Sequence, residues 1–292
     1  ISTKGSSKDT WLEALDVMGH MALLRNLRNL LEADIAPEHY ARKLVKGAEN
    51  GKQLPFRYYS AYRAIEKIAP PALLDAVEEC LMASIGNLPQ FDGRVMSLSD
   101  NSGSARGSTT SSMGTMQIAT IGNLTGILTA MQADDGHLGI FGDRLESFAV
   151  RKRSSVFDML QKAEDIGQGI GGGTENGIWL FWDKAIREKE HWNHVFVYSD
   201  MQAGHGGLYG MDASTYADYQ WKSRYIDVPK LIQTYREQVN PDVMVYLVQI
   251  AGYQDTIVPE FYNRTFMLGG WSAGILRFAA DMNALYGQQP QQ

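Results

Sequence analysis

The chain of 292 residues has a single cysteine, no strong excess of charge and no long apolar run. Cys80 has no partner for an internal disulfide, which excludes the small secreted domains that depend on disulfides. No apolar run approaches the ~18 residues that a membrane-spanning helix needs, and no signal peptide is visible. These absences predict a cytoplasmic protein without a membrane partner. The first residue is Ile1 rather than Met, which suggests a piece of a longer protein.

The charge is mildly acidic, with 27 basic and 33 acidic residues and a formal net charge of −6. This balance argues against a strong, non-specific binder of nucleic acid, because such proteins are normally basic. It does not exclude a local basic patch. Residues 1–91 carry no net charge, so the acidity lies in residues 92–292.

The spacing of apolar residues divides the chain near residue 91. From Trp11 to about Gly86 apolar residues recur at helical spacing, and prolines and one Asn-Gly pair separate four short helices. Residues 1–90 are therefore expected to form α-helical hairpins.

Beyond Pro89, short β-branched runs alternate with helical stretches. This alternation predicts an α/β domain over residues 91–292, with a doubly wound, mostly parallel sheet covered by helices on both faces. The expected strands are Val95–Ser99, Leu138–Phe141, Glu146–Val150, Val195–Tyr198, Met244–Ile250 and Thr265–Leu268. The expected helices are Met113–Met131, Val156–Ala163, Glu175–Lys189, Val228–Val239 and Ala273–Leu285.

An oxygen-rich segment, Asp100-Asn101-Ser102-Gly103-Ser104, directly follows the first of these strands. In open parallel sheets, ligands bind beyond the carboxyl ends of the strands. One carboxylate and two hydroxyls form an all-oxygen set, which suits Mg²⁺ better than zinc or copper. Taken alone, the pattern also fits an ordinary Asp/Ser turn with local hydrogen bonds.

Two further segments add polar side chains to the same edge. Gly171-Gly172-Gly173-Thr174-Glu175 opens a helix and places Thr174 at an N-cap position, while Tyr198-Ser199-Asp200 ends the fourth strand in a second acid. Two strand ends and one helix start thus supply five oxygen donors. In chain order they are Asp100, Ser102, Ser104, Thr174 and Asp200.

This set and its order resemble the metal-ion-dependent adhesion site of von Willebrand factor A (vWA) domains, which have a Rossmann-type fold. The resemblance implies a bound Mg²⁺, or another divalent cation such as Mn²⁺. It implies that Ser102, Ser104 and Thr174 are ligands, that Asp100 and Asp200 support them, often through water, and that a carboxylate of a protein partner completes the shell. The chain has Ser199-Asp200-Met201 where the family often has Thr-Asp-Gly, which puts the shape of that loop in doubt.

Basic residues cluster along the helical part of the chain. One interpretation is a solvated helix face, which is the commoner situation for any single residue. The other is a basic surface for phosphates, for which the planar fork of arginine is well suited. The candidate residues are Arg25, Arg28, Arg42, Lys43, Lys46 and Arg57.

Two short segments of this part, Ala22-Leu23-Leu24-Arg25-Asn26-Leu27 and Leu54-Pro55-Phe56-Arg57-Tyr58, resemble the TROVE module of Ro ribonucleoproteins. In that family HEAT-like helical hairpins precede a vWA domain, in the order found here. The resemblance implies binding of small non-coding Y RNAs and of misfolded RNA ends, as in RNA quality control. Residues 1–90 would then be the C-terminal end of a TROVE module.

The alternative is an intracellular vWA adaptor that binds a protein and has no RNA role. An enzyme is not expected, and no catalytic residue is assigned. Ser272 lies in a G-x-S-x-G motif between a strand and a helix, but no histidine follows it to act as the base. His191 and His194 lack further zinc ligands at suitable spacing and are expected at the surface.

Overall fold

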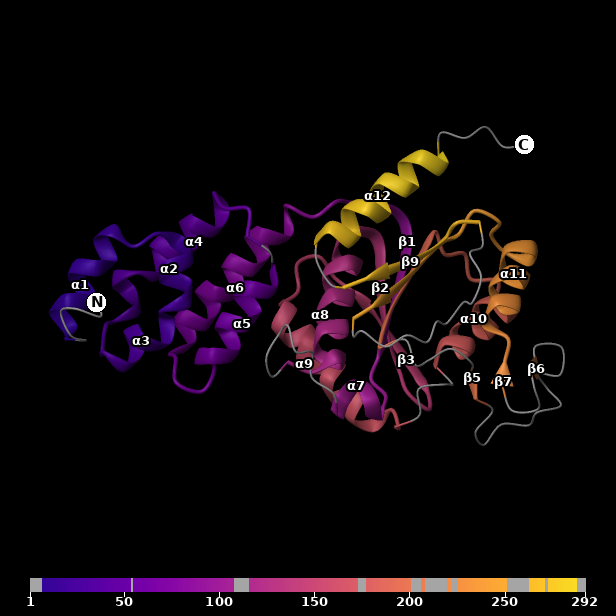
Figure 1. The fold of residues 1–292 in the computed structure, drawn as a ribbon, viewed down its shortest axis with the longest axis horizontal. Coiled ribbons are helices and arrows are strands. Elements are labelled where there is room, and N and C mark those ends of the chain that lie inside the picture. Colours follow the sequence, from indigo (N-terminus) through magenta and orange to yellow (C-terminus); the bar gives the residue numbers. More distant parts are fainter. Residues whose placement is uncertain are drawn as a thin grey trace. The chain divides into compact units, whose positions relative to one another are not determined.

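A computed structural model of the chain describes residues 7–53, 55–107, 116–172, 177–200, 206–207, 220–221, 225–250, 263–270 and 273–287. The chain forms two compact units, Ile1–Leu88 and Pro89–Gln292 (Figure 1). Among the described residues, no helix is both long enough and apolar enough to cross a membrane.

The described residues of the first unit form helices and their connections, without a strand, and the core is formed where α4 and α5 pack against α6. Leu44, Leu73 and Val77 are fully buried there. The expected helical hairpins are therefore present. The helices are α1 (Lys8–Val17), α2 (His20–Arg25), α3 (Leu27–Glu32), α4 (Ala41–Glu49), α5 (Pro55–Ile65) and α6 (Pro71–Ile85), with a 3-10 turn, η1 (Pro37–His39), before α4.

The start of this unit differs from the sequence-based prediction, because the first stretch of helical spacing contains three helices. Gly19 is extended, with ψ of 161°, and separates α1 from α2. The Asn26 side chain donates a 2.8 Å hydrogen bond to the Ala22 carbonyl and so occupies an acceptor at the end of α2. The apolar spacing continues through both breaks because all three helices bury the same kind of leucine side chain.

The second unit contains a six-stranded sheet with the strand order β3-β2-β1-β4-β8-β9. Only β3 of this sheet runs antiparallel to its neighbour. The predicted α/β class and mostly parallel sheet are confirmed. The strands are β1 (Phe91–Asp100), β2 (Ala133–Phe141), β3 (Leu145–Val150), β4 (His194–Ser199), β8 (Met244–Gln249) and β9 (Thr265–Gly269). A small second sheet contains β5 (Gly206–Gly207), β6 (Gln220–Trp221) and β7 (Tyr225–Ile226).

Helices cover both faces of the large sheet (Figure 1). On one face, α10 and α11 bury the apolar side chains of alternate strand residues such as Leu98 and Val197. On the other face, α8 packs on β1, β2 and β4, and the Tyr246 hydroxyl donates to the Ala279 carbonyl of α12 at 3.0 Å. The helices are α7 (Gly103–Gly107), α8 (Ile118–Met131), α9 (Val156–Gly169), α10 (Gly177–Arg187), α11 (Val228–Gln238) and α12 (Ala273–Gly287).

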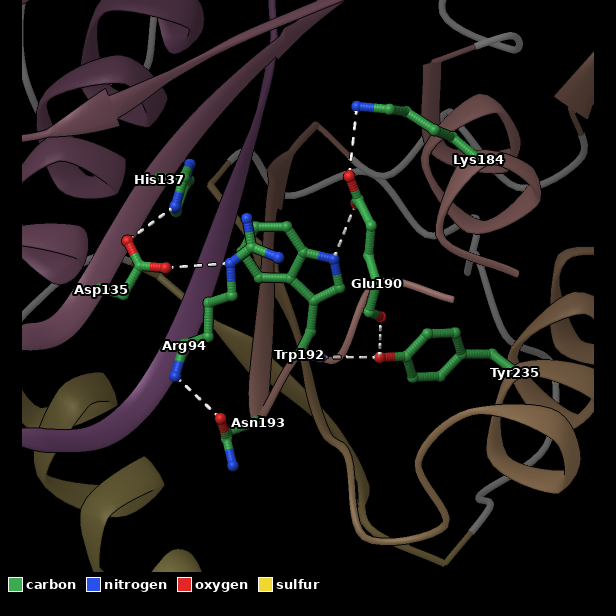
Figure 2. Close-up of polar contacts among 8 residues, drawn as sticks. All are labelled: Arg94, Asp135, His137, Lys184, Glu190, Trp192, Asn193 and Tyr235. Atoms are coloured by element: carbon green, nitrogen blue, oxygen red, sulfur yellow. Dashed lines mark hydrogen bonds and ion pairs between the residues drawn. The ribbon is translucent and has the colours of Figure 1, made fainter. Parts of the chain in front are cut away.

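The amino end of the sheet carries a polar cluster whose charges are paired (Figure 2). The Arg94 guanidinium lies 4.0 Å above the Trp192 ring, and its Nε is 3.0 Å from an Asp135 carboxylate oxygen. The other oxygen of Asp135 is 2.8 Å from the His137 ring nitrogen. The edge of His137 meets Trp192 at a centroid distance of 5.1 Å.

The indole N–H and the backbone N–H of Trp192 make further hydrogen bonds. Its indole N–H donates to Glu190 at 3.2 Å, and Lys184 lies 3.4 Å from that carboxylate. The Tyr235 hydroxyl accepts from the Trp192 backbone N–H and donates to the Glu190 carbonyl, both at 2.8 Å. The residues of this cluster, at the amino end of the sheet, thus serve as one another's hydrogen-bond and ion-pair partners.

One of the two expected surface histidines is buried. His194 begins β4, is 2% exposed and has its ring 5.4 Å from that of Phe91. Burial lowers the pKa of His194 to about 4, although the nearby Asp92 opposes this shift. His191 is exposed, as expected. The prediction failed for His194 because a histidine at the start of a buried strand stacks on aromatic neighbours instead of facing water.

We predict that Arg94→Ala lowers the free energy of unfolding by about 1–2 kcal/mol, because it removes both a cation–π contact and the partner of Asp135. Urea unfolding would measure the loss. Arg151→Ala is the matched control: Arg151 is exposed beside the same end of the sheet, and its removal should change stability by no more than about 0.5 kcal/mol. Equal effects of the two substitutions would contradict the stabilising role of the cluster.

Candidate functional site

The carboxyl ends of β1 and β4 meet at the centre of the large sheet. Ser99 of β1 pairs with Tyr198 of β4, so Asp100 lies beside Ser199 and Asp200 follows directly. The connection from β1 leads to β2 on one side, while β4 pairs on the other. This is the switch in strand order at which open α/β sheets bind their ligands.

Asp100 joins the segment after β1 to the end of β4 through its carboxylate. One oxygen accepts a 2.9 Å hydrogen bond from the backbone N–H of Ser102, just after β1. The other oxygen accepts a 2.7 Å hydrogen bond from the hydroxyl of Ser199, the last residue of β4. The start of the Asp100–Ser104 segment and the end of β4 are therefore fixed with respect to one carboxylate.

Asp100 and Asp200 are both buried, at 1% and 0% exposure. Burial and, second, the charge of Asp200 raise the pKa of Asp100 to about 6, against the opposing effect of hydrogen bonds from Ser199 and Ser102. Burial disfavours an ionised carboxylate, and a like charge nearby disfavours it further. The ionised form of Asp100 is therefore unfavourable in this corner of the protein.

The two serines of the loop place their hydroxyls side by side. The oxygen atoms of Ser102 and Ser104 are 3.2 Å apart, with Ser102 buried and Ser104 half-buried. The Gly103 N–H donates to the Gly172 carbonyl at 2.9 Å, which brings Gly172 alongside this segment. Thr174 lies outside the described residues. Of the five predicted donors, the structure thus brings together Asp100, Ser102 and Ser104 and places Asp200 close enough to shift the pKa of Asp100.

These donors fit a hard divalent cation. Every candidate ligand atom is oxygen, and the two neighbouring carboxylates leave negative charge that a cation would balance. Among the described residues, no group of three or more His, Cys, Asp or Glu side chains gathers to hold a metal. The site would therefore depend on hydroxyl ligands, which suit Mg²⁺ or Mn²⁺ and give a zinc ion little to bind.

Sequence reasoning missed two contributors to this corner. Ser199 was noted only as a departure from a motif, yet its hydroxyl donates the hydrogen bond to Asp100 that links β4 to β1. Asn123 of α8 was not considered, yet its amide is hydrogen-bonded to Asn101 inside the loop. The one amide side chain in residues 118–131, a mostly apolar stretch whose other polar residues are threonines, is the signal that could have identified it.

The six basic candidates all lie on the exposed surface of the first unit, but they are not equivalent. Arg28 forms a 2.8 Å ion pair with Glu32. Lys43 donates to the carbonyls of Leu15 and Asp16 and so completes the C-terminal end of α1.

The other four candidates have exposed side chains on three helices. Arg42 and Lys46 are one turn apart on α4 and so share a face. Arg25 ends α2, and Arg57 lies in the first turn of α5. Ser272, considered above for enzyme chemistry, lies outside the described residues.

Comparisons with known proteins bear on both units. Residues 1–90 match the family model described as the TROVE domain. Over 94% of the chain, the fold matches the crystal structure of the Ro (RSR) protein of Deinococcus radiodurans, with a TM-score of 0.64 and 15% sequence identity. The chain spans 55% of the length of that protein. A search among curated proteins gave no match. The resemblance to Ro ribonucleoproteins is thereby confirmed, and at this identity the structural match speaks for the fold alone.

The raised pKa of Asp100 predicts how the metal-free protein responds to pH. A carboxyl whose pKa is higher in the folded protein stabilises it fully below about pH 4, and this contribution is lost as the pH rises through about 6. A shift of about two units corresponds to about 3 kcal/mol. With EDTA present, wild type should therefore lose stability relative to Asp100→Asn between pH 4 and pH 7.

Urea unfolding of both proteins across that range would measure the difference. The measurement must be the difference between the two proteins. The lowered pKa of His194 makes stability rise with pH, which would mask the fall caused by Asp100 if wild type were measured by itself. His194 is present in both, so its contribution cancels. A stability difference that does not change with pH would contradict the raised pKa.

Proposed function

We propose that this chain is the RNA-binding part of a Ro-like ribonucleoprotein. Its ligands would be a small non-coding RNA of the Y RNA type and the ends of misfolded RNAs, as in RNA quality control. The observation that carries the proposal is the TROVE match over residues 1–90 in a chain whose fold follows a Ro protein over 94% of its length. The role is one of binding, with no catalytic step assigned to any side chain.

The exposed bases of the helical unit supply the chemistry for phosphate binding. Arg42, Lys46 and Arg57 are exposed and lie on neighbouring elements that both pack against α6. Arginine donates two parallel hydrogen bonds to a phosphate, and lysine adds a point charge. Because the first unit has no net charge, we expect a modest affinity that arises from a few local contacts.

We predict that the triple substitution Arg42→Glu, Lys46→Glu and Arg57→Glu weakens binding of a fluorescent stem–loop RNA with a single-stranded 3′ tail. Each lost phosphate contact removes ~0.7–0.9 from the slope of log affinity against log salt, so the slope should fall by about 2. Fluorescence anisotropy over a series of salt concentrations would measure both quantities.

The control keeps the charge change and moves it to the other unit. Arg151→Glu, Lys152→Glu and Arg153→Glu alter three consecutive exposed bases between β3 and α9. This variant should keep most of the affinity and the slope. If the two triple variants behave alike, RNA does not bind through α4 and α5. If wild type binds no RNA at all, the vWA adaptor without an RNA role becomes the better hypothesis.

The second unit is proposed to hold one Mg²⁺ at the carboxyl ends of β1 and β4. Its supports are the buried pair Asp100 and Asp200 and the adjacent hydroxyls of Ser102 and Ser104. Thr174 is proposed as a further ligand. A carboxylate from a protein partner would complete the shell, since the protein donors are mostly neutral hydroxyls. Such a site favours capture of a ligand over activation of water.

We predict that millimolar Mg²⁺ or Mn²⁺ raises the melting temperature relative to EDTA, because an ion that binds only the native state stabilises it by mass action. At 100 times the dissociation constant the gain is about 2.7 kcal/mol. Asp100→Ala should abolish the shift, whereas Glu146→Ala, which removes an exposed carboxylate on β3, should retain it. A wild-type protein that melts at the same temperature in both conditions would refute the metal site.

A further inference from the structure

A buried amide pair lies directly beneath the Asp100–Ser104 loop. The Asn101 side chain donates to the Asn123 amide oxygen at 2.8 Å, and Asn123 donates back to the Asn101 amide oxygen at 3.1 Å. The Ser99 hydroxyl donates to the same oxygen of Asn123 at 2.7 Å. All three residues have 0% exposure.

The rest of α8 makes this pair unusual. Thirteen of the 14 residues of α8 are buried, and most of them are apolar. A polar side chain at such a position is unfavourable unless its hydrogen bonds are satisfied, and a satisfied network specifies one arrangement of its surroundings. Asn123 obtains its partners from the loop and from Ser99, not from its own helix.

The neighbouring helices leave room for these amides. A methyl group added at Gly167 of α9 would lie 2.3 Å from the Asn101 amide oxygen, and one at Gly122 of α8 would lie 2.7 Å from the Ser99 hydroxyl. Both glycines are therefore required by the close approach of polar side chains. The packing of α8 and α9 is fitted around the network.

Asn101 is held at its backbone as well. Its N–H donates to the Phe141 carbonyl of β2 at 2.8 Å. Asn101 stands between Asp100 and Ser102. Hydrogen bonds at both its backbone and its side chain therefore also restrict the directions in which the side chains of these two neighbours point. Those neighbours are two of the proposed ion-binding residues.

We infer that Asn123 is a positioning residue for the cation site, acting through Asn101. The inference rests on the proposed metal site and deepens it: α8 holds the loop in the conformation that directs its oxygen atoms to the ion. The amide pair should then stabilise the ion-bound protein more than it stabilises the ion-free protein. Loss of partners beyond the direct ligands typically weakens metal binding ~10–100-fold.

The first test compares two substitutions in the same helix. Asn123→Ala removes the loop anchor, whereas Thr129→Val removes a buried hydroxyl that bonds the Tyr198 hydroxyl at 2.6 Å and lies two turns away from the loop. Both variants should lose stability in EDTA. Only Asn123→Ala should weaken Mn²⁺ binding, by about tenfold or more, as measured by electron paramagnetic resonance of free Mn²⁺.

The second test reaches the amide pair from the other helix and does not require Asn123→Ala to fold. Gly167→Ala should push the Asn101 amide away and weaken Mn²⁺ binding, as Asn123→Ala does. Gly169→Ala is its control in α9, because a methyl group there would meet nothing within 4 Å. Mn²⁺ affinity should stay at the wild-type value in Gly169→Ala.

The outcomes separate this inference from the metal site itself. If wild type binds Mn²⁺ and both Asn123→Ala and Gly167→Ala bind it equally well, the positioning role is wrong and the metal site stands. If wild type binds no Mn²⁺, both proposals are overturned. Weaker binding in Asn123→Ala and Gly167→Ala, with unchanged binding in Thr129→Val and Gly169→Ala, is the result that supports the role.

Discussion

The burial of two acids at the centre of one sheet edge is the constraint on which the second unit depends. Asp100 and Asp200 lie where water is excluded, so their charges are neither screened nor solvated. The protein offsets part of this with hydrogen bonds from Ser102 and Ser199 to a single carboxylate. What remains is a raised pKa of Asp100, so the ionised form of this carboxyl lowers the stability of the fold at its switch point.

The two ends of the sheet treat charge in opposite ways. At the amino end, Arg94 contacts Asp135 directly and lies over the ring of Trp192, so these charges are paired within the chain (Figure 2). At the carboxyl end, Asp100 and Asp200 are both buried, and Asp100 accepts hydrogen bonds from Ser102 and Ser199. The charges at the amino end stabilise the fold, whereas the raised pKa of Asp100 shows that its charge at the carboxyl end is unfavourable.

Local signals in the sequence were sufficient for the strands of the large sheet. The central strands β4 and β8 are short runs of almost entirely buried residues because both faces of the sheet are covered there. The polar residues Asp100, Ser102 and Asp200 lie at or just beyond the carboxyl ends of β1 and β4. The segment around Gly19 and Asn26 was predicted less well, because side-chain capping ended helices whose apolar spacing continued. The surface position expected for His194 was wrong, and the contacts of Lys43 were not foreseen, for a shared reason. Their partners, an aromatic ring and two helix-terminal carbonyls, come from distant parts of the chain. The pairing of Asn101 with Asn123 is equally non-local: the amide in α8 marks Asn123 as unusual, but local sequence does not indicate which residue it pairs with.

The hydrogen bond between Ser199 and Asp100 joins residues 99 positions apart. Closing so long a loop is entropically unfavourable until the strands between have paired, so this bond forms late in folding. A nascent chain that has left the ribosome only as far as α10 contains Asp100, Ser102 and Ser104 but lacks the strand that completes their surroundings. Capture of an ion would then follow synthesis of β4. An interaction formed after the transition state slows unfolding and leaves the folding rate almost unchanged. A cation bound at this stage would slow unfolding and so extend the lifetime of the folded domain.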